Sequence, residues 1–225
     1  MVIYLQGLTN LNTHKQILFI GDYETMTNGK WLIGCEESGR VRDALRSVGI
    51  DAWSCDLLPC TENPSKYHIQ DDLLKVIKSE KWEAIISFPP CTHLCLSSNR
   101  WRAEKIADGR EKAAIDFVEA IWDADCNYIA IENPVGVLGT KSKLGKATQY
   151  VQPYWFGDKH RKKTGLWLKG FPKLVPTNML DISKISEKEL NKLYYLAPSP
   201  TRALMRSKTP LGLAQAMATQ WGGLV

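Results

Sequence analysis

The stretch SFPPCTHLC at 87–95 places a cysteine directly after two prolines. The prolines fix φ and remove two backbone donors, so they stiffen the exit from the apolar run before them and aim the Cys91 side chain. A thiol has an ordinary pKa of about 8.5 and needs help to become a thiolate at neutral pH. The stretch alone leaves three roles for Cys91: a buried apolar side chain, a metal ligand, or a nucleophile.

A metal site here would use Cys91, His93 and Cys95, with Cys55 or Cys60 as a further ligand. The C-x-H-x-C spacing lacks a second ligand pair at zinc-like spacing, and the two prolines stiffen its start. We therefore expect no metal, and we expect His93 to be a loop residue or a polar wall of a pocket.

A carboxylate follows the next apolar run, where YIAIE at 128–132 ends in Glu132. Asn133 and Pro134 make this strand exit rigid as well. A glutamate near a nucleophile can donate a proton to a bound base or hold the base in place. The pairing of Cys91 with Glu132 favours the nucleophile role for the thiol.

Three earlier apolar runs also end in residues suited to a ligand. GCEESG at 34–39 differs from the dinucleotide fingerprint, and its Glu36 and Glu37 repel a phosphate but suit a ligand with a positive end. Asp56 can accept hydrogen bonds from ribose hydroxyls, and Asp72 from an adenine amino group. The alternative is a tight turn with solvated acids. The order of the acids favours an adenosyl ligand without phosphates, which S-adenosylmethionine fits.

The elements that must position these residues alternate along the chain. We expect strands at 31–35, 51–55, 67–70, 84–88 and 128–132, with helices over 41–48, after residue 70 and over 110–124. This order predicts a mostly parallel, doubly wound α/β sheet, in which ligands bind beyond the carboxyl ends of the strands.

Beyond Pro134 the pattern changes. QYVQPYW and TGLWLKG predict an antiparallel strand pair around the basic turn GDKHRKK, and residues 186–194 predict a short helix. Thr209 and Pro210 predict the start of a last helix, LGLAQAMATQW. Residues 1–28 show weak periodicity, so we expect an N-terminal extension before one catalytic domain at 29–225.

Charge is distributed unevenly over the 225 residues, whose net charge is +5. From Lys141 onward there are fifteen Lys and Arg against four Asp and Glu, whereas the first 140 residues are mildly acidic. A basic second part indicates contact with a polyanion, and the alternative is an ordinary solvated surface. No apolar run approaches the roughly 18–20 residues of a membrane span. The six cysteines suit reduced thiols, so we expect a cytoplasmic protein that meets no membrane.

In their order along the chain, seven motifs resemble those of DNA (cytosine-5) methyltransferases, in particular the short forms common in phage genomes. The motifs are GCEESG, CDLLP, QDDL, FPPC, IENP, HRKKTGLWL and SKTPLGLAQAMATQW, and the resemblance covers about residues 31–225. Three departures stand out: the glycine loop is altered, Thr92 replaces the usual Gln, and the arginine-rich strand is diluted. A minimal basic insert at about 165–206 stands where family members with a defined target carry a large recognition domain.

The resemblance implies a Rossmann-like fold, S-adenosylmethionine as the methyl donor, and DNA as the partner, either a duplex with base flipping or a single strand. It implies a phage or bacterial host cytoplasm, and nothing in the sequence indicates an obligate protein partner. Catalytic roles fall to Cys91, Glu132 and Arg161. Cofactor contacts fall to Gly34, Cys35, Glu36, Ser38, Gly39, Asp56, Leu57, Asp72, Leu73 and Pro90. Nucleic-acid contacts fall to Asn133, Lys159, His160, Lys162 and Lys163.

Two other functions stay open at this point. An amino-group methyltransferase acting on adenine N6 or cytosine N4 also has two prolines after its fourth strand, but Phe88 and Cys91 do not match its hydrogen-bonding and stacking positions. A catalytically silent, nucleic-acid-binding relative is the other alternative, because the recognition domain is minimal.

Overall fold

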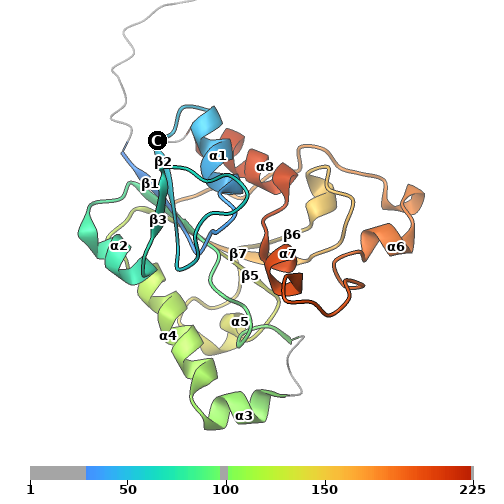
Figure 1. The fold of residues 1–225 in the computed structure, drawn as a ribbon, viewed down its shortest axis with the longest axis horizontal. Helices are drawn as coiled ribbons and strands as arrows, with labels where there is room; N and C mark the ends of the chain where they lie inside the picture. The colour runs from blue at the N-terminus through green and yellow to red at the C-terminus, as the bar shows by residue number, and fades with distance from the viewer. Residues whose placement is uncertain (1–28, 97–100, 224–225) are drawn as a thin grey trace, which may run out of the picture.

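Short apolar runs form the strands of a central sheet, as the sequence predicts. The computed structural model describes residues 29–96 and 101–223, so the predicted extension at 1–28 lies outside the described residues. The sheet has the strand order β3-β2-β1-β4-β5-β7-β6 (Figure 1). Its strands are β1 (Trp31–Gly34), β2 (Ala52–Asp56), β3 (His68–Gln70), β4 (Ala84–Ser87), β5 (Tyr128–Pro134), β6 (Gln149–Val151) and β7 (Thr164–Lys169).

The first five strands pair in parallel, whereas β7 is antiparallel to both β5 and β6. This confirms the predicted Rossmann-like α/β fold with an antiparallel strand pair toward the C-terminus. The carboxyl ends of β1 to β5 therefore meet at one edge of the sheet. Because β7 runs the other way, the residues just before it lie at that same edge.

Helices cover both faces of the sheet. They are α1 (Arg40–Ser47), α2 (Leu73–Ser79), α3 (Arg102–Ala107), α4 (Arg110–Trp122), α5 (Leu138–Lys141), α6 (Glu187–Leu190), α7 (Arg202–Ser207) and α8 (Leu211–Trp221). In Figure 1, α1 and α8 lie together above the sheet, and α2 and α4 lie below it. No helix in the described ranges is long and apolar enough to cross a membrane.

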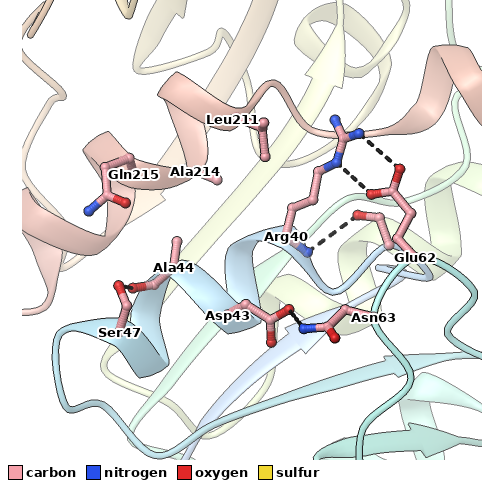
Figure 2. Close-up of a pocket in the computed structure, with 10 residues that line it drawn as sticks. Arg40, Asp43, Ala44, Ser47, Glu62, Asn63, Leu211, Ala214 and Gln215 are labelled. Carbon is pink, nitrogen blue, oxygen red and sulfur yellow. Dashed lines mark hydrogen bonds and ion pairs between the residues drawn. The ribbon is translucent and has the colours of Figure 1, made fainter.

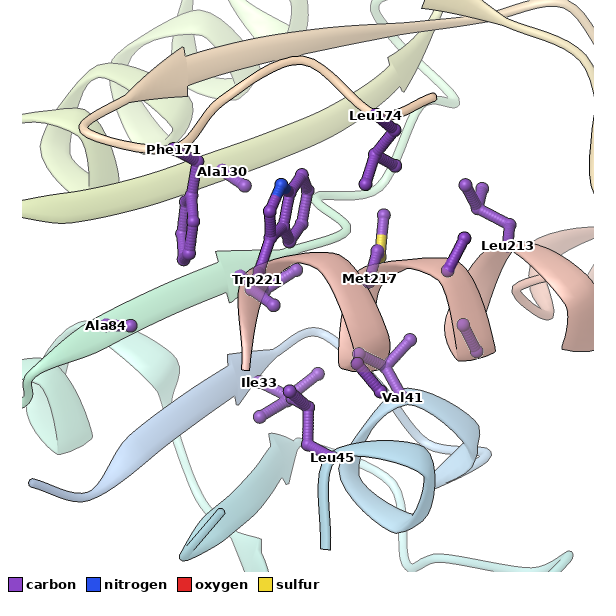
Figure 3. Close-up of a cluster of buried hydrophobic side chains, with 14 of the residues drawn as sticks. Ile33, Val41, Leu45, Ala84, Ala130, Phe171, Leu174, Leu213, Met217 and Trp221 are labelled. Atoms are coloured by element: carbon purple, nitrogen blue, oxygen red, sulfur yellow. The ribbon is translucent and has the colours of Figure 1, made fainter. Parts of the chain in front are cut away.

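Successive side chains of β1 point to opposite faces of the sheet and pack in two separate hydrophobic cores. Trp31 and Ile33 pack with α1 and α8, whereas Leu32 packs with α2 and α4 on the other face. Figure 3 shows Met217 and Trp221 of α8 directed into the first core, where the Trp221 ring stacks on Phe171 at 4.6 Å between centroids. Burial on both faces explains why these strands read as continuous apolar runs.

Two boundaries differ from the sequence prediction, whereas the last helix spans LGLAQAMATQW as expected. Residues 153–155 form a 3₁₀ helix instead of extending the strand. The predicted insert at about 165–206 begins inside β7, so the segment outside the sheet starts after Lys169. The reason is that β7 is needed as a central strand between β5 and β6.

A fully buried arginine ties α1 to the loop that follows β2. The Arg42 guanidinium donates to the Asp43 carboxylate, to the Ser54 hydroxyl at 3.0 Å and to the Asn63 carbonyl at 2.9 Å. The Ser54 hydroxyl also lies 2.8 Å from Nδ1 of His68. This network fixes the loop beside the sheet edge, since each buried donor has an acceptor.

We expect Arg42→Met to lower the free energy of unfolding by about 2–4 kcal/mol, because the substitution strands buried acceptors. Urea unfolding followed by circular dichroism measures this change. Lys75→Met, at the exposed Lys75–Asp71 pair, is the matched control and should change stability by less than about 0.5 kcal/mol. Equal stabilities of the two variants would show that the guanidinium does not hold the loop.

Candidate active site

Cys91 lies in a tight turn just beyond the carboxyl end of β4. Its carbonyl accepts hydrogen bonds from the backbone N–H groups of Leu94 and Cys95, both at 3.0 Å, so the residues after the prolines form one helical turn. The turn is fastened on two sides. The Val137 N–H donates to the Leu94 carbonyl at 2.8 Å, and the buried Lys105 ammonium donates to the Thr92 carbonyl at 2.6 Å.

Glu132 lies at the end of β5, the strand next to β4, and is buried. The Thr164 hydroxyl donates a short hydrogen bond to Oε1 of Glu132. The Lys162 ammonium lies 3.8 Å from the same oxygen. The backbone N–H of Lys162 donates to the Gln152 side chain at 3.1 Å, which holds this residue beside the sheet.

Asn133 links the two strand ends directly. Its side-chain amide donates to the Pro89 carbonyl at 2.9 Å, so the residue after Glu132 holds the prolines that precede Cys91. Asn133 is 1% exposed, and its Oδ1 has no hydrogen-bond partner among the described residues. The geometry makes Asn133 a positioning residue. Its sequence-based role in contacting nucleic acid stays a prediction.

The structure places Arg161 away from this group. Its guanidinium forms two hydrogen bonds with the Glu187 carboxylate on α6, at 2.9 and 3.0 Å. The antiparallel pairing of β5 and β7 sets Pro134 opposite Thr164, and side chains alternate along an extended chain. Lys162 and Thr164 therefore share the side of Glu132, and Arg161 does not. Lys162 and Thr164, and not Arg161, are the residues that contact Glu132 in this structure, and the catalytic role expected for Arg161 stays a prediction.

The sequence predicts that Lys162 contacts nucleic acid, and it does not single out Thr164 as a site residue. The register of β7 against β5 is the signal that assigns both residues, because it decides which alternate positions face Glu132. The other basic residues of the turn lie in different surroundings. Lys159 and Lys163 are exposed, and the Lys163 ammonium lies 4.9 Å from the centre of the Tyr150 ring. His160 is buried, and burial lowers its pKa.

The Cys91 thiol is held in its protonated form. A hydrogen bond with the Cys95 thiol, then burial, and then the nearby Glu132 charge raise the pKa of Cys91 well above its ordinary value. The Lys162 charge opposes this rise. Cys91 is therefore a nucleophile only if something further stabilises the thiolate, and Lys162 is the cation placed to do so.

The turn after β1 is built as predicted, but its acids serve the fold. Glu36 is buried, and its carboxylate accepts the backbone N–H groups of Val41 at 2.6 Å and Arg42 at 3.3 Å, so it caps α1. Burial raises the pKa of Glu36 to about 8. The buried Glu37 carboxylate accepts from the backbone and hydroxyl of Thr61. Neither carboxylate is available to the positive end of a ligand, which corrects that expectation for Glu36.

Other residues of this turn are explained by packing. Cys35 has a φ of 55° and Gly39 a φ of 70°, left-handed values that turn the chain from β1 into α1. A side chain at Gly34 would come within 2.6 Å of the buried Leu73 methyl groups. Burial raises the pKa of the Cys35 thiol to about 12.

The edge beyond β2 and β3 keeps features that suit an adenosyl group. Asp56 is half-buried, burial raises its pKa, and its Oδ1 accepts from the Leu58 N–H at 2.9 Å. Leu57 is 70% exposed beside it, an apolar surface of the kind a flat base can cover. Asp72 caps α2 by accepting from Leu74 and Lys75 N–H groups, so part of its carboxylate is already used. Pro90 is exposed next to Cys91.

One hollow of about 470 Å³ lies between α1, α8 and the loop after β2 (Figure 2). Arg40 and Glu62 form a paired salt bridge across its rim, and the Arg40 guanidinium also donates to the Thr209 carbonyl at 3.0 Å. Of the predicted cofactor residues only Ser38 lines this hollow. It is therefore distinct from the edge that carries Cys91, Glu132 and Asp56.

The cysteines and histidine around Cys91 do not gather further ligands. Nowhere in the described ranges do three or more His, Cys, Asp or Glu side chains come together as a metal site. The buried Nδ1 of His93 has no hydrogen-bond partner among the residues that the structure describes. Cys95 contacts the Cys91 thiol and pairs its backbone with Gly136.

Comparison of the sequence with protein-family models and with curated proteins finds no match. Solved structures similar in fold include two methyltransferases. The Entamoeba histolytica methyltransferase EhMeth shares 16% identity and a TM-score of 0.44 over 68% of this chain and 58% of that chain. The S. pombe Dnmt2 methyltransferase shares 16% identity and a TM-score of 0.43 over 64% of this chain and 51% of that chain. The match thus spans less than two thirds of either neighbour.

We expect the Cys91 thiol to react slowly with iodoacetamide at pH 7 and faster as the pH rises, with no plateau by about pH 9, because its pKa is raised. Glu132→Gln should speed the reaction several-fold at a fixed pH by removing an anion, and Lys162→Met should slow it. Mass spectrometry of the Cys91 peptide measures each rate.

The control is Glu104→Gln, which removes an exposed carboxylate on α3 and should leave the rate unchanged. A rate at pH 7 as high as that of an exposed model thiol would contradict the raised pKa. Identical rates in Glu132→Gln and Lys162→Met would contradict the charge coupling.

Proposed function

We propose that this protein is an S-adenosylmethionine-dependent methyltransferase that acts on C5 of cytosine in DNA through a covalent Cys91 intermediate. The observation that carries the proposal is the meeting of a thiol, a carboxylate and an ammonium group at one sheet edge. Cys91 follows β4, Glu132 lies near the carboxyl end of β5, and Lys162 lies 3.8 Å from Glu132. The motif order in the sequence supports the same chemistry.

In the proposed reaction the Cys91 thiolate adds to C6 of the base. The new S–C6 bond takes up the thiolate electron pair, and the C5–C6 π electrons move onto C5 and toward N3. In this proposal Glu132 hydrogen-bonds or protonates N3, which stabilises the charge that develops in the ring. After the methyl group reaches C5, loss of the C5 proton lets the S–C6 bond break and releases the thiolate.

Lys162 and Thr164 support both groups in this proposal. The ammonium group offsets the Glu132 charge, which otherwise opposes ionisation of the Cys91 thiol. The Thr164 hydroxyl donates to Oε1 of Glu132 and so fixes the orientation of the carboxyl group. Asn133 holds the Pro89 carbonyl and through it the approach to Cys91.

The residues beyond β2 and β3 fit the adenosyl part of the methyl donor. S-adenosylmethionine, when bound, supplies an electrophilic methyl group to a carbon nucleophile. We propose that Asp56 accepts the ribose hydroxyls and that the exposed Leu57 and the turn at Asp72 contact the adenine. Glu36 and Glu37 are committed to the fold, so backbone groups of the 34–39 turn are left to hold the amino-acid end.

We expect wild-type protein to form an SDS-resistant complex with an oligonucleotide that contains 5-fluorocytosine when S-adenosylmethionine is present. Cys91→Ser should abolish both this complex and methyl transfer to ordinary cytosine, because no S–C6 bond forms. Glu132→Gln should lower the transfer rate by about 100-fold or more. Radiolabelled transfer followed by nucleoside analysis separates 5-methylcytosine from amino-methylated bases.

Lys162→Arg should retain more activity than Lys162→Met, and Lys162→Met should move the pH–rate profile to higher pH. Lys75→Met is the remote control. A covalent complex that survives in Cys91→Ser would overturn the assigned nucleophile. Amino-methylated products would favour the alternative reaction class.

A further inference from the structure

The segment between β7 and α8, together with the turn before β7, forms a positively charged lobe. This basic lobe, residues 156–163 and 170–208, carries eleven Lys and Arg against four Asp and Glu. Figure 1 shows its helices α6 and α7 on the side of β7 away from β1 to β3. Its charge matches a polyanion, as the uneven composition of the sequence indicates.

All four acidic side chains of the basic lobe are engaged within the protein. Asp158 accepts from the Gly212 N–H, Asp181 from Ser183 and Lys184, Glu187 from Arg161 and Asn191, and Glu189 from Lys192. Lys159, Lys163, Lys188 and Arg206 are exposed. The anions are thus offset locally, and the remaining cations define the field of this surface.

Two adjacent tyrosines stand out on this charged surface. Tyr194 is 71% exposed and Tyr195 is 62% exposed, and their rings meet edge to face with centroids 5.5 Å apart. In an edge-to-face pair one ring covers part of one face of the other, and the high exposure of both side chains leaves the remaining ring faces to solvent. Exposed ring faces on a positively charged lobe are suited to stack on bases.

The tyrosine pair is held by the backbone rather than by its rings. The N–H groups of Tyr194 and Tyr195 both donate to the Asn191 carbonyl, at 2.8 and 3.1 Å, and Arg202 donates to the Tyr194 carbonyl at 3.2 Å. The rings therefore sit on an anchored turn, and both side chains stay largely exposed. Such preorganisation lowers the entropy lost when a ligand binds.

The same segment is fastened to the candidate active site. The Arg161 backbone N–H donates to the Leu190 carbonyl at 2.7 Å, and the Arg161 guanidinium pairs with Glu187. Both contacts join α6 to the residue that directly precedes Lys162. The tyrosine turn, which follows α6, is thereby connected to the strand entrance that carries Lys162 and Thr164.

The described part of the lobe suits unpaired nucleotides better than a duplex groove. Its helices α6 and α7 have four and six residues, and it contains no two-stranded ribbon, so the elements that usually read a major groove are missing from the ranges described. In a duplex the base faces are already stacked on one another. Exposed aromatic side chains stack on bases only where the strand is open.

We propose that Tyr194 and Tyr195, exposed on the basic lobe, form a stacking platform for unpaired nucleotides of a single-stranded nucleic acid. The role of this platform rests on the proposed function, since the platform would hold the strand whose cytosine reaches Cys91. In this proposal Arg161 holds α6 in place through its contacts with Glu187 and Leu190 and takes no part in the chemical step.

The test is fluorescence anisotropy with a 5′-fluorescein-labelled single-stranded DNA 20-mer, the same strand as RNA, and the DNA duplex. Wild-type protein should bind the single strands more tightly than the duplex. Tyr194→Ala/Tyr195→Ala should weaken single-strand binding about tenfold or more, whereas Tyr194→Phe/Tyr195→Phe should stay within about twofold, because the ring faces are kept. Met179→Ala, at another exposed apolar side chain of the lobe, is the matched control.

Equal single-strand affinities for wild type and the alanine variant would overturn the platform, as would an equal loss of duplex binding. Circular dichroism checks the fold of each variant, and the phenylalanine variant keeps the comparison valid if the alanine variant unfolds. Binding is measured apart from methyl transfer. A platform that binds without transfer refutes the proposed function alone, and transfer with unchanged binding in the alanine variant refutes the platform alone.

Discussion

The antiparallel pairing of β7 with β5 is the contact on which the candidate site depends. It sets Thr164 opposite Pro134 and brings Lys162 and Thr164 to the Glu132 carboxylate at the edge where Cys91 emerges. A shift of one residue in this register would turn Lys163 toward Glu132 and Lys162 away, because side chains alternate along a strand. One strand pairing therefore selects which cation faces the buried acid.

Burial gives this edge its chemical character. Because the parallel strands are covered on both faces, polar groups that act on a ligand are confined to the strand ends. The hydrogen bond with the Cys95 thiol, burial and the neighbouring Glu132 charge all raise the pKa of Cys91, and the Lys162 charge lowers it. The site is thus a balance of opposing charges around one thiol, and a bound base that takes up the Glu132 hydrogen bond would alter that balance.

Many of the polar side chains near this edge form hydrogen bonds that stabilise the fold. Glu36 caps α1, Glu37 holds Thr61, and Arg42 joins α1 to the loop after β2. These groups fix the turn and loop between which a ligand would lie. Residues that look like ligand contacts in the sequence are here the means by which short loops keep one conformation, since buried polar groups require partners.

The sequence by itself determined the order of strands and helices along the chain, the α/β class and the residues at each strand end, because apolar runs and turn residues are local signals. It also placed Cys91 just after one strand and Glu132 near the end of another, and the structure shows that these two strands are neighbours. Only the tertiary structure decided that Arg161 pairs with Glu187, that Lys162 and Thr164 meet Glu132, and that Glu36 is a cap. These outcomes depend on strand register and on hydrogen-bond partners far apart in the chain, which no local pattern encodes.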